Sequence, residues 1–386
     1  MSKGFKSFSK KVLPIILTLG TVTTLTVISM FYAQGYRLEF DETSTTQVKI
    51  EKTGILAVRS IPDAAKIYIN GELKDTTNAT LASLPIGTYN LKVQKEGFET
   101  WEKKVQVYED LVTDTTAVLV LKGGGLNPLT NSGVGEYQVS HSGEKIVFTS
   151  EFEQKPGLYE VTLSGTPINI FQSGQKAIIL DTPGILYSKA TEINFSPNDQ
   201  ELLVKVGDNY YLIGVTKGAA QTPEVYADTS LVFEKWDETE IKNKTSLAEA
   251  LKVPSELKEL AIGKSAVWSP DGEKILVTGK NDENVYTVEV YNFEDPLPVG
   301  EKRFYNAVKY NGDDTNVFWY SDSKHLLLVT ENAVDLVAID GTNKYRLYDG
   351  EVIGAKSVAS PGGDKVIIKT KIKSDGPANL YMISIR

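Results

Sequence analysis

The chain has 386 residues, a net charge of −9 and no cysteine. Without cysteine it can form no disulfide, no zinc–thiolate centre and no cysteine nucleophile. Its acidity argues against nucleic-acid binding, which needs clustered lysine and arginine side chains against the phosphates.

The N-terminal 35 residues have the pattern of a membrane anchor. Residues 1–11 hold four lysines and no acid, and residues 12–35 hold no charged side chain. A helix of about 20 apolar residues spans a hydrocarbon core, and lysines favour the cytoplasmic side. The sequence therefore predicts a cytoplasmic basic tail (1–11), one transmembrane helix (12–35) in the lipid bilayer of the cell membrane, and an extracytoplasmic remainder. A cleaved signal peptide is the alternative, although its apolar region usually has about 7–15 residues.

A small domain follows a polar segment. Residues 36–53 are rich in threonine and are interpreted as a spacer, with room for one early hairpin. Residues 54–121 contain short alternating strands separated by turns, among them Asn70-Gly71, a strong hairpin signal. Many short strands in about 70 residues predict a β-sandwich.

Residues 54–121 also resemble the PEGA domain. That family is named for a Pro-Glu-Gly-Ala motif, and this chain has Pro62-Asp63-Ala64-Ala65, followed later by Lys95-Glu96-Gly97-Phe98. The resemblance implies a surface-exposed sandwich of the cell envelope without catalytic residues. Because Ala64 replaces the glycine, we expect no positive φ at this position.

Residues 126–386 repeat one strand–turn–strand pattern five times. Its clearest copy, Ser269-Pro270-Asp271-Gly272, combines a proline that pre-sets the turn with residues suited to the turn itself. Such repetition is typical of a β-propeller. The pattern resembles the turns of TolB-like and WD-repeat propellers, which implies recognition rather than chemistry. The copies start at Ser140, Ser196, Ser269, Ser321 and Ser360.

The expected fold is all-β, with five blades favoured and six possible. The fifth blade ends one strand short at Arg386, so we expect 126–130 to supply its missing outer strand. The outer strand of the first blade is expected at 168–171. Segment 177–188 is then an extra hairpin or a degenerate sixth blade.

A helical insertion is expected at 237–263. Ser246 and Ser255 are interpreted as N-caps with capping boxes of two short helices, which Pro254 separates. Insertions in repeat proteins often lie on the binding face. A lid that caps the propeller or packs on the sandwich is the alternative.

Few residues suggest a site. His141 and His325, the only histidines, fall on the repeated turn and are expected to be solvated. Segments 281–284 and 313–314 offer oxygen ligands for Ca²⁺, with solvated loops as the alternative. Trp101 and Trp236 are the candidate binding aromatics, although for Trp101 the favoured interpretation is that it covers the edge of the sandwich.

The sequence thus predicts no catalytic residue, metal or cofactor. The expected function is that of a membrane-tethered extracytoplasmic binding or scaffold protein that recognises an envelope protein or a surface glycan. A propeller glycosidase or lyase acting on surface polysaccharide is the alternative, and it needs paired carboxylates in the central funnel. A sensor ectodomain would need a partner, because only eleven residues lie inside.

Overall fold

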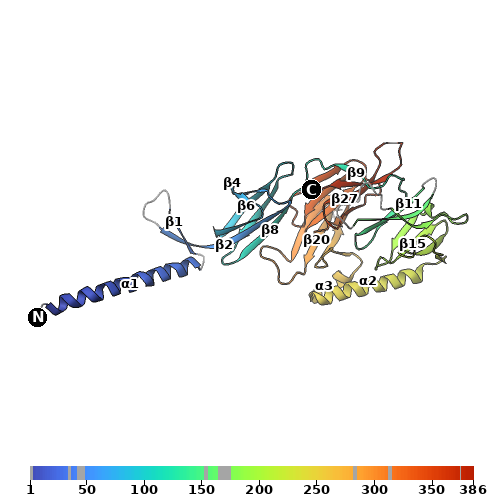
Figure 1. Ribbon diagram of the computed structural model, residues 1–386. Coiled ribbons are helices and arrows are strands. Elements are labelled where there is room, and N and C mark those ends of the chain that lie inside the picture. Colours follow the sequence, from blue (N-terminus) through green and yellow to red (C-terminus); the bar gives the residue numbers. More distant parts are fainter. Residues whose placement is uncertain are drawn as a thin grey trace. The chain divides into compact units, whose positions relative to one another are not determined.

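The structure, a computed structural model, describes residues 3–33, 36–40, 48–151, 155–163, 175–280, 285–311, 315–373 and 375–386. These residues form two compact units (Figure 1). The first contains the N-terminal helix and a β-sandwich, and the second contains a β-propeller with two inserted helices.

Helix α1 spans Lys3–Ala33 and therefore includes most of the segment predicted as a basic tail. Within it, Pro14–Tyr32 is long and apolar enough to cross a membrane, with a mean hydropathy of 1.8 over 19 residues. Its threonines donate their hydroxyls to carbonyl oxygens one turn earlier, as Thr18 does to Pro14 at 2.7 Å. Their polar groups consequently need no water in an apolar environment.

The sandwich consists of two four-stranded sheets. Strand β2 pairs with β1, β5 and β8, and the other sheet has the order β4-β3-β6-β7. The segment predicted as a spacer contains β1 and the beginning of β2, which pair antiparallel in agreement with the early hairpin expected there. Because β2 continues without a break through residue 53, the predicted boundary at that residue lies inside a strand. The strands are β1 (Tyr36–Phe40), β2 (Val48–Ile61), β3 (Lys66–Ile69), β4 (Glu72–Thr76), β5 (Ala79–Pro85), β6 (Gly87–Gln94), β7 (Trp101–Val107) and β8 (Val112–Val118).

The backbone at Ala64 contradicts the expectation from its side chain. Ala64 has φ 56°, which is the left-handed conformation that favours glycine. Its side chain is exposed, so nothing around it prevents this conformation. The exchange of glycine for alanine changes the strain of this turn and leaves its geometry in place.

The propeller consists of five four-stranded antiparallel blades. In blades one to four the strands follow chain order, from the first strand to the outer fourth strand. Blade one has β10 (Tyr137–Val139), β11 (Lys145–Ser150), β12 (Gly157–Thr162) and β13 (Lys176–Leu180); blade two has β14 (Glu192–Phe195), β15 (Glu201–Val206), β16 (Asn209–Gly214) and β17 (Glu224–Tyr226); blade three has β18 (Ala266–Trp268), β19 (Lys274–Lys280), β20 (Val285–Asn292) and β21 (Phe304–Asn311); blade four has β22 (Asn316–Trp319), β23 (His325–Thr330), β24 (Ala333–Ala338) and β25 (Tyr345–Asp349).

Blade five is completed as predicted. It has β26 (Ser357–Ala359), β27 (Lys365–Thr370) and β28 (Asn379–Ser384), and its outer strand is β9 (Leu126–Pro128). Met382 pairs with Asn127 in this closure. Next to it the buried hydroxyl of Thr130 donates to Asn379 Oδ1 at 3.0 Å and accepts the N–H of Leu380.

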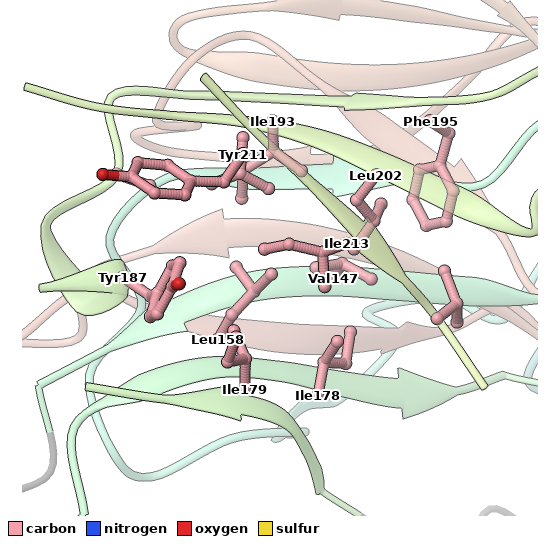
Figure 2. Packing of buried hydrophobic residues seen from close by; sticks show 13 residues of the cluster. Val147, Leu158, Ile178, Ile179, Tyr187, Ile193, Phe195, Leu202, Tyr211 and Ile213 are labelled. Carbon is pink, nitrogen blue, oxygen red and sulfur yellow. The ribbon is translucent and has the colours of Figure 1, made fainter. Parts of the chain in front are cut away.

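The prediction of five blades is confirmed for the described residues, and the sixth-blade alternative is wrong. Residues 176–180 form the outer strand of blade one, whereas the strand expected at 168–171 lies outside the described residues. The following link contains a short 3-10 turn, Tyr187–Lys189. There Tyr187 is buried between blades one and two, so the link fills a gap between blades (Figure 2).

Neighbouring blades are held together by apolar side chains from both sheet faces. Figure 2 shows this contact for blades one and two, where Tyr187 packs edge-on against Tyr211 with ring centroids 5.5 Å apart. Each blade buries both of its faces in this way, which explains the continuous apolar runs of the middle strands. The cluster includes Val147, Leu158, Ile178, Ile179, Ile193, Phe195, Leu202, Val204 and Ile213.

The inserted helices differ from the expected pair. Helix α2 spans Ser230–Ala250 and α3 spans Ser255–Ile262. Ser246 lies inside α2, where its hydroxyl donates to Lys242 O, so it is no N-cap. Ser255 is the first residue of α3, after Pro254 at the N-cap, and makes no side-chain cap. The residue three positions later is Lys258 and not a glutamate, so there is no capping box either. The predicted break at Pro254 is confirmed.

Replacing Ala64 with glycine should raise the free energy of unfolding by about 1 kcal/mol, because a left-handed L-residue costs about 1–2 kcal/mol. Chemical denaturation of the full chain in detergent measures the change. Ala57→Gly in strand β2 is the control and should lower stability by about 0.5–1 kcal/mol. Equal signs for the two variants would contradict the assigned backbone conformation.

Replacing Thr130 with valine should lower the free energy of unfolding by about 1–3 kcal/mol, because it leaves the N–H of Leu380 buried without this partner. Thr191→Val is the matched control, since Thr191 is exposed, and should change stability by less than about 0.5 kcal/mol. Equal effects in the same denaturation experiment would show that the closing strand contributes little.

Candidate binding site at the inserted helices

The five repeated turns share one backbone conformation. In each, the residue three positions after the start donates its N–H to the carbonyl of the starting residue and has a positive φ. Glycine occupies this position in blades one, three and five, whereas blades two and four have Asp199 and Ser323. In blade four the turn starts at Tyr320, one residue before the expected Ser321.

That one-residue shift corrects the prediction for His325. The histidine is the first residue of β23, beyond the turn, and it is buried. Its Nδ1 lies 2.7 Å from Asp322 Oδ2, and Asp322 Oδ1 also accepts its backbone N–H. Asp322 thus replaces the serine hydroxyl that accepts the equivalent N–H in the other blades.

His141 lies on the turn as predicted, and its side chain is 54% exposed. Its Nδ1 is 3.3 Å from Asp199 Oδ1, and the Asp199 carboxylate also accepts the backbone N–H groups of His141 and Ser142. The hydrogen bond to Asp199 raises the pKa of His141, with a smaller contribution from the charge of Glu240 on α2. Burial would raise the pKa of Asp199, but these hydrogen bonds lower it to about 2.

Helix α2 lies over the face of the propeller that carries these turns, which we name the turn face. Glu240 acts on His141 in blade one, and Leu247 lies beside Gly272 in blade three, 3.5 Å from where a Cβ on that glycine would be. Figure 1 shows α2 and α3 along one end of the blades. The insertion therefore covers part of the propeller, which supports the lid interpretation.

The insertion is anchored mainly on blade three. Ala248, Val253 and Ala261 are buried against Ile275 and Phe293. The indole of Trp268 donates to Ala261 O at 3.0 Å, which fastens α3 to the repeated turn.

A pocket of about 370 Å³ lies where the α2–α3 connection meets blade three. This volume falls within the range of small-molecule sites, about 300–1,000 Å³. Its apolar walls come from both sides, and charged side chains line its remainder. The lining residues are Leu251, Lys252, Pro254, Leu257, Asn292, Phe293, Asp295 and Arg303. Of these residues the sequence indicated only Pro254, as the break between the helices, because about 40 residues separate the two walls and no motif connects them.

The two candidate binding aromatics, Trp101 and Trp236, are both buried, as favoured for Trp101. Trp101 is 3% exposed at the start of β7, and Trp236 on α2 is 8% exposed with its ring edge-on to Phe233. Both indoles belong to packed regions, because a large aromatic gains most from burial. Neither ring offers a binding surface in this structure.

The first strands of the blades, which form the inner ring of the propeller, contain one carboxylate, that of Glu192. It accepts hydrogen bonds from Asn194 and Tyr210. A glycosidase needs two carboxyl groups about 5–10 Å apart, and these strands supply one. The candidate Ca²⁺ segments 281–284 and 313–314 lie outside the described residues. Among the described residues, no group of three or more His, Cys, Asp or Glu side chains is placed to hold a metal ion.

The comparison with known families identifies the β-sandwich segment. The model of the PEGA domain family matches residues 53–122, which confirms the resemblance of this segment. No curated protein matches the chain.

Solved structures that resemble the chain include three propellers. The putative TolB from Agrobacterium tumefaciens is 15% identical over 73% of this chain and 80% of that chain, with a TM-score of 0.25. TolB from Acinetobacter baumannii is 12% identical over 77% and 60%, with a TM-score of 0.26. The β-propeller domain of the Trilobed protease from Pyrococcus furiosus is 10% identical over 86% and 82%, with a TM-score of 0.22. The assignment of a propeller here follows from the pairing within the five blades.

Replacing His141 with glutamine should reduce stability at low pH and leave it unchanged at high pH. A histidine whose pKa is raised by folding stabilises the protein below its unfolded pKa of about 6.5, and this contribution disappears as the pH rises through the folded pKa. The melting temperatures of both proteins at pH 5.5 and pH 9 test this. A difference that is the same at both pH values would show that the charged pair with Asp199 contributes nothing.

Proposed function

We propose that the protein is a membrane-tethered binding protein of the cell envelope. In this proposal α1 crosses the cell membrane with its N-terminus in the cytoplasm, and the propeller recognises an envelope protein or a surface glycan outside. The observation that carries the proposal is the succession, in one chain, of a 19-residue apolar span and a PEGA domain.

The features of the propeller support binding over catalysis. His141 on its turn and His325 at the start of β23 each lie within hydrogen-bond distance of an aspartate, and the inner strands hold one carboxylate. What departs from the repeat is the helical insertion with its pocket, and insertions of this kind often form the binding face of repeat proteins. In this proposal the propeller is the framework that presents the binding surface.

The topology can be tested with single cysteines, because the natural chain has none and gives no background. Ser7→Cys in α1, Glu72→Cys in the sandwich and Glu238→Cys on α2 are treated with a membrane-impermeant maleimide. In intact cells we expect labelling of the two exposed glutamate positions, and labelling of the first only after permeabilisation. The opposite pattern, or a shortened chain released from the membrane, would refute the anchored orientation.

Recognition can be tested with the same variants after attachment of a photoactivatable maleimide. A binding protein should give a discrete cross-linked adduct from Glu238→Cys on the insertion. Digestion of the adduct with a protease or with a polysaccharide hydrolase then distinguishes an envelope protein from a glycan. Depolymerisation of surface polysaccharide by the purified chain would instead establish the alternative, a glycosidase or lyase.

A further inference from the structure

The pocket between the α2–α3 connection and blade three has an apolar lining and three charged residues. Leu251, Pro254 and Leu257 come from the α2–α3 connection. Phe293, whose ring is buried, follows β20 and comes from blade three. Such a surface favours an apolar group that leaves water. All of these residues belong to one compact unit, so the pocket does not depend on the sandwich.

The charges of the lining leave one cation available. Arg303 donates to Glu294 O at 2.6 Å and lies 3.7 Å from Asp295 Oδ1, so its guanidinium is already engaged. Lys252 lines the same pocket, is exposed, and forms no ion pair with any described residue. With Asp295 counted, the lining has a net charge of +1 in a chain whose net charge is −9.

Asn292 also lines the pocket and is 1% exposed. Its Oδ1 accepts the N–H of Glu294 at 2.9 Å, which identifies the oxygen end of the amide. The Nδ2 end is buried and has no partner among the described residues. A buried donor without a partner costs about 1–3 kcal/mol, and an acceptor oxygen that reaches it would remove this cost.

We propose that this pocket binds a small carboxylate that carries an apolar body. The carboxylate pairs with the ammonium group of Lys252 and accepts a hydrogen bond from Asn292 Nδ2, and the body lies between Leu257 and Phe293. A monoanion fits better than a dianion such as phosphate, because one cation is free and Asp295 repels further negative charge. This site does not rest on the proposed function, since a small ligand could bind with or without a polymeric partner.

The experiment is isothermal titration calorimetry of the full chain in detergent. The probe is 3-phenylpropionate, with its neutral amide and phenyl phosphate as comparisons. We expect the carboxylate to bind and both comparisons to bind at least about fivefold more weakly, as expected for loss of one ion pair or hydrogen bond. Equal affinities for the carboxylate and its amide would show that the probe merely partitions into apolar surface, and this result would overturn the proposal.

Two variants assign the contact. Lys252→Gln should weaken binding about fivefold or more, whereas Lys258→Gln, which removes an exposed cation outside the pocket, should leave it unchanged. Asn292→Asp keeps the oxygen that accepts the Glu294 N–H but removes the donor, and it should abolish binding. Unchanged affinity of Lys252→Gln would refute the site even if Asn292→Asp failed to fold. Absence of probe binding at millimolar concentration would also overturn the proposal.

Discussion

The pairing of β28 with β9 is the contact on which the propeller depends. It joins Tyr381 to Pro128 and Ile383 to Leu126, residues about 250 positions apart, and so fixes both ends of the ring in one sheet. Without it, β28 would be an open edge, and the apolar residues Leu380 and Met382 would lose cover. The entropy of closing so long a loop grows only slowly with its length. One short strand, whose residues are half-buried or exposed, therefore suffices together with the buried hydrogen bonds of Thr130 next to it.

The turn face shows a second constraint, since every blade needs a left-handed residue at one position. Glycine meets this without strain in three blades. Asp199 and Ser323 accept the strain, and their side chains bond the preceding turn: Asp199 accepts N–H groups of blade one, and Ser323 Oγ accepts the N–H of Asp271. Asp199 and Ser323 therefore have strained backbones but form hydrogen bonds between neighbouring blades. The imidazole of His141 also contacts the Asp199 carboxylate.

Local patterns determined what could be predicted. The turns and the apolar middle strands depend on nearby residues and were predictable. The outer strand of blade five comes from residues about 250 positions away, and it was predictable because the chain ends one strand short of a full blade. His325 was assigned wrongly because the turn of blade four starts at Tyr320, and Asp322, two positions later, accepts the N–H that the starting serine accepts in the other blades. The start of α2 at Ser230 was missed because its first turns lack a capping side chain, and the pocket could not be predicted because it needs the packing of α3 on blade three.

That packing also explains why a binding site lies beside the repeat and not within it. The faces of the blades are buried against neighbouring blades, and hydrogen bonds join the repeated turns to one another. Few side chains of the blades and turns therefore remain free to bind a ligand. The connection after α2 is different: Val253 is buried against blade three, whereas the neighbouring Lys252, with φ 52°, is exposed. A concave surface with an unpaired cation arises there because an added segment covers the framework without completing its packing.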